Sequence, residues 1–408
     1  MKRALICSLT ALTIGVSTQA WGQQTGSGIP TSQPATRKLE IDLTTQVVYD
    51  TDVTRSSAAL AAVRGLKQND EIFDPNGSLR FAMPISREAI FLNVSGGYQL
   101  YRTNRILDRA HVDVVGGLMA RLAICRATVT GTYDRAEASL ADLALLTRSN
   151  VVNHENVGME GSCGKPYGLG TSFGVSQDWH SNSAPQEAQA DSRTLSSHFG
   201  VTYSRPTFGT LSLFGQYAKT DFPARIVLPG LPPISNGYEN YSGGVSFDRH
   251  LGARIEASAS VSYSVVNPTL AIIHGTKSFT YSLDATYRLS SRLNTHGSFS
   301  RSTTPSSRID STYSINESYL GEINYKLGSR LSFHLGGQWL SRHFQGLIGP
   351  VTGALNGDNT YYVYGTANFQ LSPRWSISLD ARQEQRDANP VVFSYSGPRV
   401  GLTAKAAF

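Results

Sequence analysis

Apolar and polar residues alternate along most of the chain, from Leu39 to its last residue. In segment 253–265 every second residue is apolar, and the residues between are polar or charged. A period of two places successive side chains on opposite faces of a β-strand. Such segments therefore predict strands with one apolar and one hydrophilic face. The apolar residues of this segment are Ala253, Ile255, Ala257, Ala259, Val261, Tyr263 and Val265.

About eighteen such segments follow one another, and sixteen is the alternative count, because boundaries read from sequence are uncertain by roughly two to four residues. Short and long connections alternate between them, which is typical of bacterial outer-membrane barrels. The sequence therefore predicts an all-β fold, a transmembrane antiparallel β-barrel over residues 39–408, with both termini on the periplasmic, short-turn side. The expected long loops are 52–77, 134–150, 181–192, 222–237, 266–276, 303–312 and 342–360.

Other many-stranded folds fit this pattern less well. A β-propeller or β-helix would show a fixed sequence period, and none is found. Aromatic residues of the apolar face gather near strand ends, as in the aromatic girdles of membrane barrels. The last strand ends at Phe408, which resembles the recognition signal of the outer-membrane barrel assembly machinery. Contact with that machinery and with outer-membrane lipid is therefore expected.

The N-terminal residues predict the compartment. A basic start, Met1-Lys2-Arg3, precedes an apolar stretch that ends at Val16, and small residues follow up to Gly22. This order is typical of a secretory signal peptide. We expect residues 1–22 to be that signal peptide, residues 23–38 to be a disordered periplasmic linker, and the barrel to lie in a Gram-negative outer membrane.

Charge and motifs argue against a nucleic-acid partner and against enzymatic activity. The net charge is +6, and its basic residues are spread along the chain rather than clustered as in a nucleic-acid binder. The nine histidines show neither zinc-ligand spacing nor a nucleophile motif. We expect no catalytic residue, no metal site and no cofactor.

Two cysteines remain after the signal peptide, Cys125 and Cys163. They fall at the short-turn ends of two consecutive predicted strands, and both lie on the outward face. A simple hairpin register places them nearly opposite each other, which suits a disulfide in an oxidising compartment. The alternative is two unrelated small apolar residues.

If apolar residues face lipid, residues of the opposite parity line the interior, and barrels of sixteen to eighteen strands leave a water-filled lumen. Basic residues recur at the short turns, where they predict an electropositive periplasmic mouth for anionic cargo. Alternatively, they are solvated turn residues or reach lipid phosphates. Those of inward parity are Arg254, Arg288, Arg292, Lys326, Arg330 and Arg374. Segment Ser56–Leu66 has helical composition, and it either narrows the lumen or forms an ordinary extracellular loop.

The motif Tyr49–Arg55, YDTDVTR, follows the first strand. With the tyrosine-rich strands and the C-terminal Phe408, it resembles the porin-like outer-membrane β-barrel family associated with exopolysaccharide gene clusters. The resemblance implies an eighteen-stranded pore that passes an exopolysaccharide, with a periplasmic polysaccharide-export protein as partner and the polysaccharide as cargo. A general or nutrient-uptake porin is the first alternative. The second is a structural or adhesive barrel acting through its long loops.

Overall fold

The computed structural model describes residues 37–144, 146–165, 167–225, 236–270, 273–306, 308–346 and 355–408. The predicted signal peptide, 1–22, and nearly all of the predicted linker, 23–38, lie outside the described residues. The described chain holds one short α-helix, α1 (Ala58–Val63), and the 3-10 turns η1 (Arg105–Leu107), η2 (Pro185–Ala190) and η3 (Val391–Phe393). Its strands are β1 (Lys38–Asp50), β2 (Asp70–Ile85), β3 (Glu88–Tyr101), β4 (Arg109–Leu122), β5 (Cys125–Glu137), β6 (Val151–Gly164), β7 (Gly168–Asn182), β8 (Ser192–Arg205), β9 (Gly209–Phe222), β10 (Asn236–Leu251), β11 (Ile255–Pro268), β12 (Thr276–Arg288), β13 (Leu293–Pro305), β14 (Tyr313–Leu327), β15 (Leu331–Gln345), β16 (Gly357–Gln370), β17 (Trp375–Asn389) and β18 (Tyr395–Ala407).

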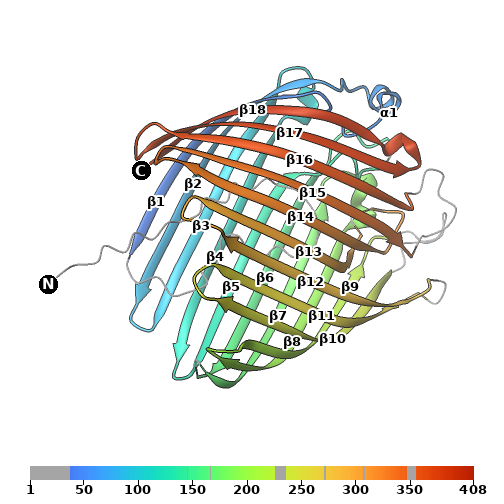
Figure 1. Cartoon of the computed structure of the whole chain (residues 1–408). Helices are drawn as coiled ribbons and strands as arrows, with labels where there is room; N and C mark the ends of the chain where they lie inside the picture. Colours follow the sequence, from blue (N-terminus) through green and yellow to red (C-terminus); the bar gives the residue numbers. More distant parts are fainter. Residues whose placement is uncertain are drawn as a thin grey trace.

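The strands form one closed antiparallel barrel (Figure 1). Each strand pairs with the next along the chain, and β1 also pairs with β18, with Val47 opposite Leu402 at the closing seam. The predicted eighteen-stranded barrel is confirmed, and the alternative of sixteen strands is wrong. The start of β1 lies beside the end of β18 at the short-turn end, where Asp42 faces Ala407.

Strand β2 begins at Asp70, well inside the predicted loop 52–77. The sequence Asp-Pro-Asn-Gly at positions 74–77 is typical of a turn, which is why the pattern placed the loop end too late. In the barrel this stretch stays extended and pairs with β1. Its register with β3 skips Asp74 and Pro75, because proline has no N–H to donate to a neighbouring strand.

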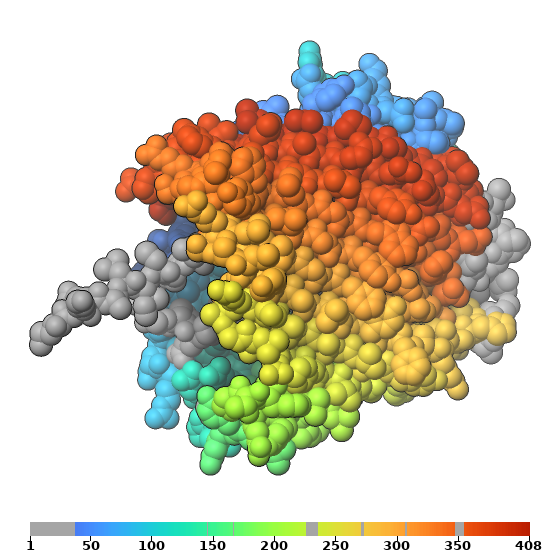
Figure 2. Space-filling view, viewed as in Figure 1, coloured from blue at the N-terminus to red at the C-terminus, as the bar shows by residue number. Residues whose placement is uncertain are grey.

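The outer wall of the barrel is apolar and exposed, as a lipid-facing surface requires. Figure 2 shows one side of this wall, formed by the strands coloured from yellow to red. Leu39 and Val47 on β1, for example, are 54% and 51% exposed. Four rings on neighbouring strands form a ladder near the middle of this wall, with centroids 4.8, 5.1 and 5.0 Å apart. The ladder consists of Tyr281, Phe299, Tyr319 and Trp339. No α-helix among the described residues is long and apolar enough to cross a membrane.

Clusters of buried apolar residues lie at the long-loop end of the barrel. One cluster combines β1 and β2 with the β1–β2, β3–β4 and β5–β6 loops. A second combines α1, β15, the β15–β16 loop and η3. The molecule is therefore packed where its long loops meet. The first cluster consists of Val48, Val53, Leu66, Ile72, Leu107, Leu140 and Leu143, and the second of Leu60, Phe344, Leu355 and Phe393.

Candidate functional site

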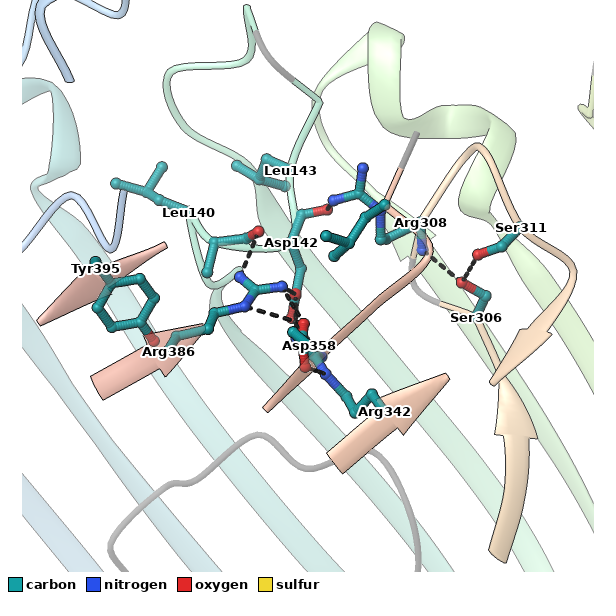
Figure 3. A network of polar contacts seen from close by, with 12 residues as sticks. Leu140, Asp142, Leu143, Ser306, Arg308, Ser311, Arg342, Asp358, Arg386 and Tyr395 are labelled. Carbon is teal, nitrogen blue, oxygen red and sulfur yellow. Dashed lines mark hydrogen bonds and ion pairs between the residues drawn. The ribbon is translucent and has the colours of Figure 1, made fainter. Parts of the chain in front are cut away.

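The loop between β5 and β6, residues 138–150, leaves its own wall and reaches the wall formed by β15, β16 and β17 (Figure 3). Five strands lie between β17 and β5 along the shorter way around the barrel, which is roughly 29 Å of wall at about 4.8 Å per strand. Its partners on that wall face inward and lie close to the long-loop ends of their strands, so the loop spans the barrel at its long-loop end. We call residues 138–150 the crossing loop.

The tip of the crossing loop is held by buried ion pairs. The carboxylate oxygens of Asp142 lie 2.8 and 3.1 Å from guanidinium nitrogens of Arg342. Arg386 donates to the carbonyl of Ala141 at 2.7 Å and to Asp142 at 3.3 Å. Asp358 binds both arginines, with its oxygens 2.7 Å from Arg342 and 3.0 Å from Arg386. We call Asp142, Arg342, Asp358 and Arg386 the Asp142 clamp.

Burial and charge both bear on the clamp. The side chains of Asp358 and Arg386 are 0% and 1% exposed, and that of Asp142 is 14% exposed. Burial favours the protonated form of Asp142, but Arg342 and Arg386 outweigh it and hold the pKa of this carboxyl well below its usual range. Asp142 is therefore ionised at neutral pH, and removing one partner would leave a charge buried without compensation.

Buried arginines that donate to backbone carbonyls join the long loops to one another. Arg64, just after α1, donates to Leu140 at 2.9 Å and to Ala144 at 3.1 Å. Arg225, after β9, donates to Gln189 at 3.1 Å and to Ser311 at 2.7 Å. Burial lowers the pKa of each guanidinium to about 10. These contacts link loops from most of the barrel circumference into one assembly.

Segment Ser56–Leu66 contains the helix that its composition indicates. Ser57 caps α1 by accepting from the N–H of Leu60 at 3.3 Å. The segment packs between the crossing loop, through Arg64, and η3, through a hydrogen bond from Ser57 to Val392. It therefore supports the crossing loop. The loop that spans the interior is 138–150, for which sequence patterns gave no signal.

The YDTDVTR motif has a local structural role. Arg55, at φ 48°, donates to both carboxylate oxygens of Asp50, at 3.1 and 2.6 Å. The hydroxyl of Thr54 donates to Asp52 at 2.7 Å. Arg55 also lies 3.8 Å from Glu384 of β17. The motif thus folds the start of the β1–β2 loop against the closing seam.

The inner wall of the barrel carries hydrogen-bonded polar residues at mid-strand. His296 on β13 lies 2.8 Å from Asp284 and 3.2 Å from Glu322, and Glu322 also accepts from Tyr364 at 2.5 Å. No group of three or more His, Cys, Asp or Glu residues in the described ranges is arranged to hold a metal ion. These residues give the lumen a polar lining of mixed charge.

The structure places Cys125 and Cys163 directly opposite each other on β5 and β6. Their Cα atoms are 4.0 Å apart and their sulfurs are bonded. The oxidised state of the pair in the membrane stays a prediction. Phe408 lies at the closing seam, where it exchanges two backbone hydrogen bonds with Ile41, at 2.8 and 3.1 Å. Its role as an assembly signal is likewise a prediction.

The predicted basic residues lie together at the short-turn end and are exposed. Backbone hydrogen bonds link the turns that carry them, from Arg288 to Arg254 at 2.8 Å and from Lys326 to Arg292 at 2.9 Å. None of the six forms an ion pair with an acid in the described ranges. Register adds Arg121 and Arg126, which face each other on the inward side of β4 and β5 and were missing from the predicted set. The six are Arg254, Arg288, Arg292, Lys326, Arg330 and Arg374.

A closed eighteen-stranded antiparallel sheet with an apolar outer wall and a polar inner wall defines an outer-membrane, porin-like β-barrel. Residues 234–408 match the model of the family described as "Putative beta-barrel porin 2". No curated protein sequence matches the chain.

Among crystal structures, the chain is similar to OccK2 (OpdF) of Pseudomonas aeruginosa, with 12% identity over 91% of this chain and 98% of that chain and a TM-score of 0.49. It is also similar to the siderophore receptor PirA of Acinetobacter baumannii, with 8% identity over 92% and 81% and a TM-score of 0.48. For OpdK of Pseudomonas aeruginosa the identity is 10% over 91% and 99%, with a TM-score of 0.46.

Proposed function

We propose that this barrel is a passive uptake porin for small polar solutes. The observation that carries the proposal is the crossing loop, which the Asp142 clamp fixes across an otherwise polar lumen. A segment fixed in this position narrows the passage and limits it to solutes much smaller than the barrel. In the proposed orientation, the short turns and both chain termini face the periplasm and the long loops face the exterior.

Export of an exopolysaccharide, the first expectation from sequence, has less support. It rests on the YDTDVTR motif, and in the structure this motif serves to fold a loop against the seam. A polymer also needs an uninterrupted passage, whereas the crossing loop would have to leave its buried ion pairs first. The predicted partner, a periplasmic polysaccharide-export protein, and the predicted polysaccharide cargo stay predictions.

The basic short-turn mouth gives the pore a preference for anions in this proposal. Arg254 and Arg288 are neighbours across two turns, as are Arg292 and Lys326. Like charges at neighbouring positions of a sheet repel each other. Arg288 and Lys326 stand on the inward face of β12 and β14. A cluster of one sign at a pore mouth raises the local concentration of the opposite ion.

The test is solute flux through the purified protein in liposomes. Swelling rates are measured with a series of neutral sugars, from a pentose to an oligosaccharide of five units. The proposal expects fast entry of the smallest sugars and a sharp decline with size. Entry of the oligosaccharide at the rate of the pentose, or no entry of any sugar, would overturn it.

A further inference from the structure

Two arginines lie side by side on the lumen face of the barrel, away from the clamp. Arg382 on β17 is directly opposite Arg399 on β18. Opposite residues of an antiparallel pair have Cα atoms about 4.5–5.5 Å apart, so their side chains are neighbours. Two positive charges at such positions repel each other unless an anion lies between them.

Both guanidinium groups have unused donors. Arg382 donates to Glu384 at 2.8 Å, and its guanidinium carbon lies 4.2 Å from the centroid of the Tyr362 ring. Its Nε is buried and has no acceptor in the described chain. Arg399 is only partly exposed, and no residue in the described ranges forms a hydrogen bond or ion pair with it.

The nearby acids are already engaged. Asp50 faces Arg399 in the β1–β18 register, but both of its carboxylate oxygens accept from Arg55. Glu384 is shared by Arg382, Arg55 and the hydroxyl of Tyr395. Asp380, one lumen position along β17, accepts from Gln46 at 3.2 Å. The Nε of Arg382 and the guanidinium of Arg399 form no hydrogen bond with any of these acids in the described chain.

The arginines at the long-loop end differ from this pair. Arg342, Arg386 and Arg308 each bind carboxylates, and Arg225 binds three backbone carbonyls. A partly buried guanidinium without acceptors is costly. The contrast indicates that the free donors of Arg382 and Arg399 serve something other than the fold.

We propose that Arg382 and Arg399 form a binding site for the carboxylate of a small anionic solute inside the pore. The inference rests on the proposed porin function and names its substrate class. A guanidinium presents its donors in a planar fork that matches the two oxygens of a carboxylate. Arg382 lies four residues from Arg386, roughly 13 Å along β17. The carboxylate is therefore held on the short-turn side of the crossing loop.

The test measures chloride current through the full-length protein in planar bilayers while sodium acetate replaces an inert salt at constant ionic strength. Wild-type protein is expected to show saturable inhibition by acetate. Arg399→Gln should raise the half-inhibiting acetate concentration at least about tenfold, since a charge-assisted hydrogen bond contributes about 1.5–3 kcal/mol. Arg399→Lys should raise it too, because an ammonium lacks the fork. The matched control is Arg249→Gln on the outer face, which should leave it unchanged.

The outcomes separate the inference from the porin function. Wild-type channels that conduct chloride without any saturable effect of acetate would overturn the site and leave the porin standing. Absence of channels would overturn the porin function itself. Inorganic phosphate that inhibits at lower concentration than acetate would contradict the assignment to carboxylates. Far-UV circular dichroism of each variant shows whether the barrel has formed.

Discussion

The carboxylate of Asp142 lies 2.8 Å from the guanidinium of Arg342, although 200 residues separate them in the chain. One residue belongs to a loop rooted in β5 and β6, and the other belongs to β15 on a distant wall. This contact shows that the loop spans the barrel at its long-loop end. It also identifies the side chains whose removal would release the bridge.

Replacing Asp142 with asparagine should loosen the crossing loop. Removing one partner of a fully buried ion pair costs about 3–5 kcal/mol, and somewhat less where a side chain keeps 14% exposure, as Asp142 does. We expect larger single-channel conductance with frequent transitions between levels. The matched control is Asp387→Asn. Asp387 is an exposed acid on β17 next to Arg386 of the clamp, and its variant should behave like wild type. Identical recordings for both variants would contradict the clamp.

The clamp should also resist acid. Because the pKa of Asp142 is lower in the folded protein than in the unfolded chain, the stabilisation is fully present above the ordinary carboxyl pKa, about 4. It is lost only when the pH falls through the depressed value. Conductance levels should therefore stay constant from pH 8 down to about pH 4. A transition to larger conductance near pH 6 would show that another group controls the loop.

We expect the disulfide between Cys125 and Cys163 to stabilise the folded barrel measurably. In the chain-entropy model a bond that closes a loop of 38 residues contributes about 3–4 kcal/mol, and its removal affects chiefly the unfolded state. The double variant Cys125→Ser, Cys163→Ser should form the barrel but unfold at lower denaturant concentration. Mass spectrometry of non-reduced digests of native protein should find the two cysteine peptides linked, and free thiols at both positions would refute the bond.

Neutralising the basic mouth should change ion selectivity. The double variant Arg288→Gln, Arg292→Gln should shift the reversal potential in a salt gradient towards cations, because it removes two inward charges at the short-turn end. The control pair, Arg205→Gln and Arg249→Gln, removes two charges of outward parity at the same end. An equal shift in both variants would favour a general surface charge over a selective mouth.

The strands could be predicted from sequence because lipid on one side and water on the other impose a local period of two. The same pattern placed Cys125 and Cys163 opposite each other, as the register shows. Parity failed near the turns, where Arg121 and Arg126 were left out of the inward set. Near a turn, few residues of the apolar–polar alternation remain, and the turn can shift which residues face inward on the next strand.

The crossing loop could not be predicted, because its partners are distant in sequence. Asp142 stands in a segment without periodicity, and its meaning depends on where the loop folds. A partial signal existed on the receiving wall. Arg342, Asp358 and Arg386 are charged residues on the inward faces of three neighbouring strands, at the same height, and such a group indicates an ion-pair site at a pore wall. Only the structure shows that Asp142 of the crossing loop is the partner of this group.

The most direct test of the crossing loop is the single-channel conductance of a variant in which residues 139–148 are replaced by a short Gly-Ser linker. If the loop narrows the lumen, conductance should rise at least about twofold, because an eighteen-stranded barrel without a constriction has an open aqueous interior. Circular dichroism and the closing β1–β18 pairing should be retained, since the strands do not depend on the loop. A folded variant with the conductance of wild type would contradict the claim that this loop sets the width of the pore.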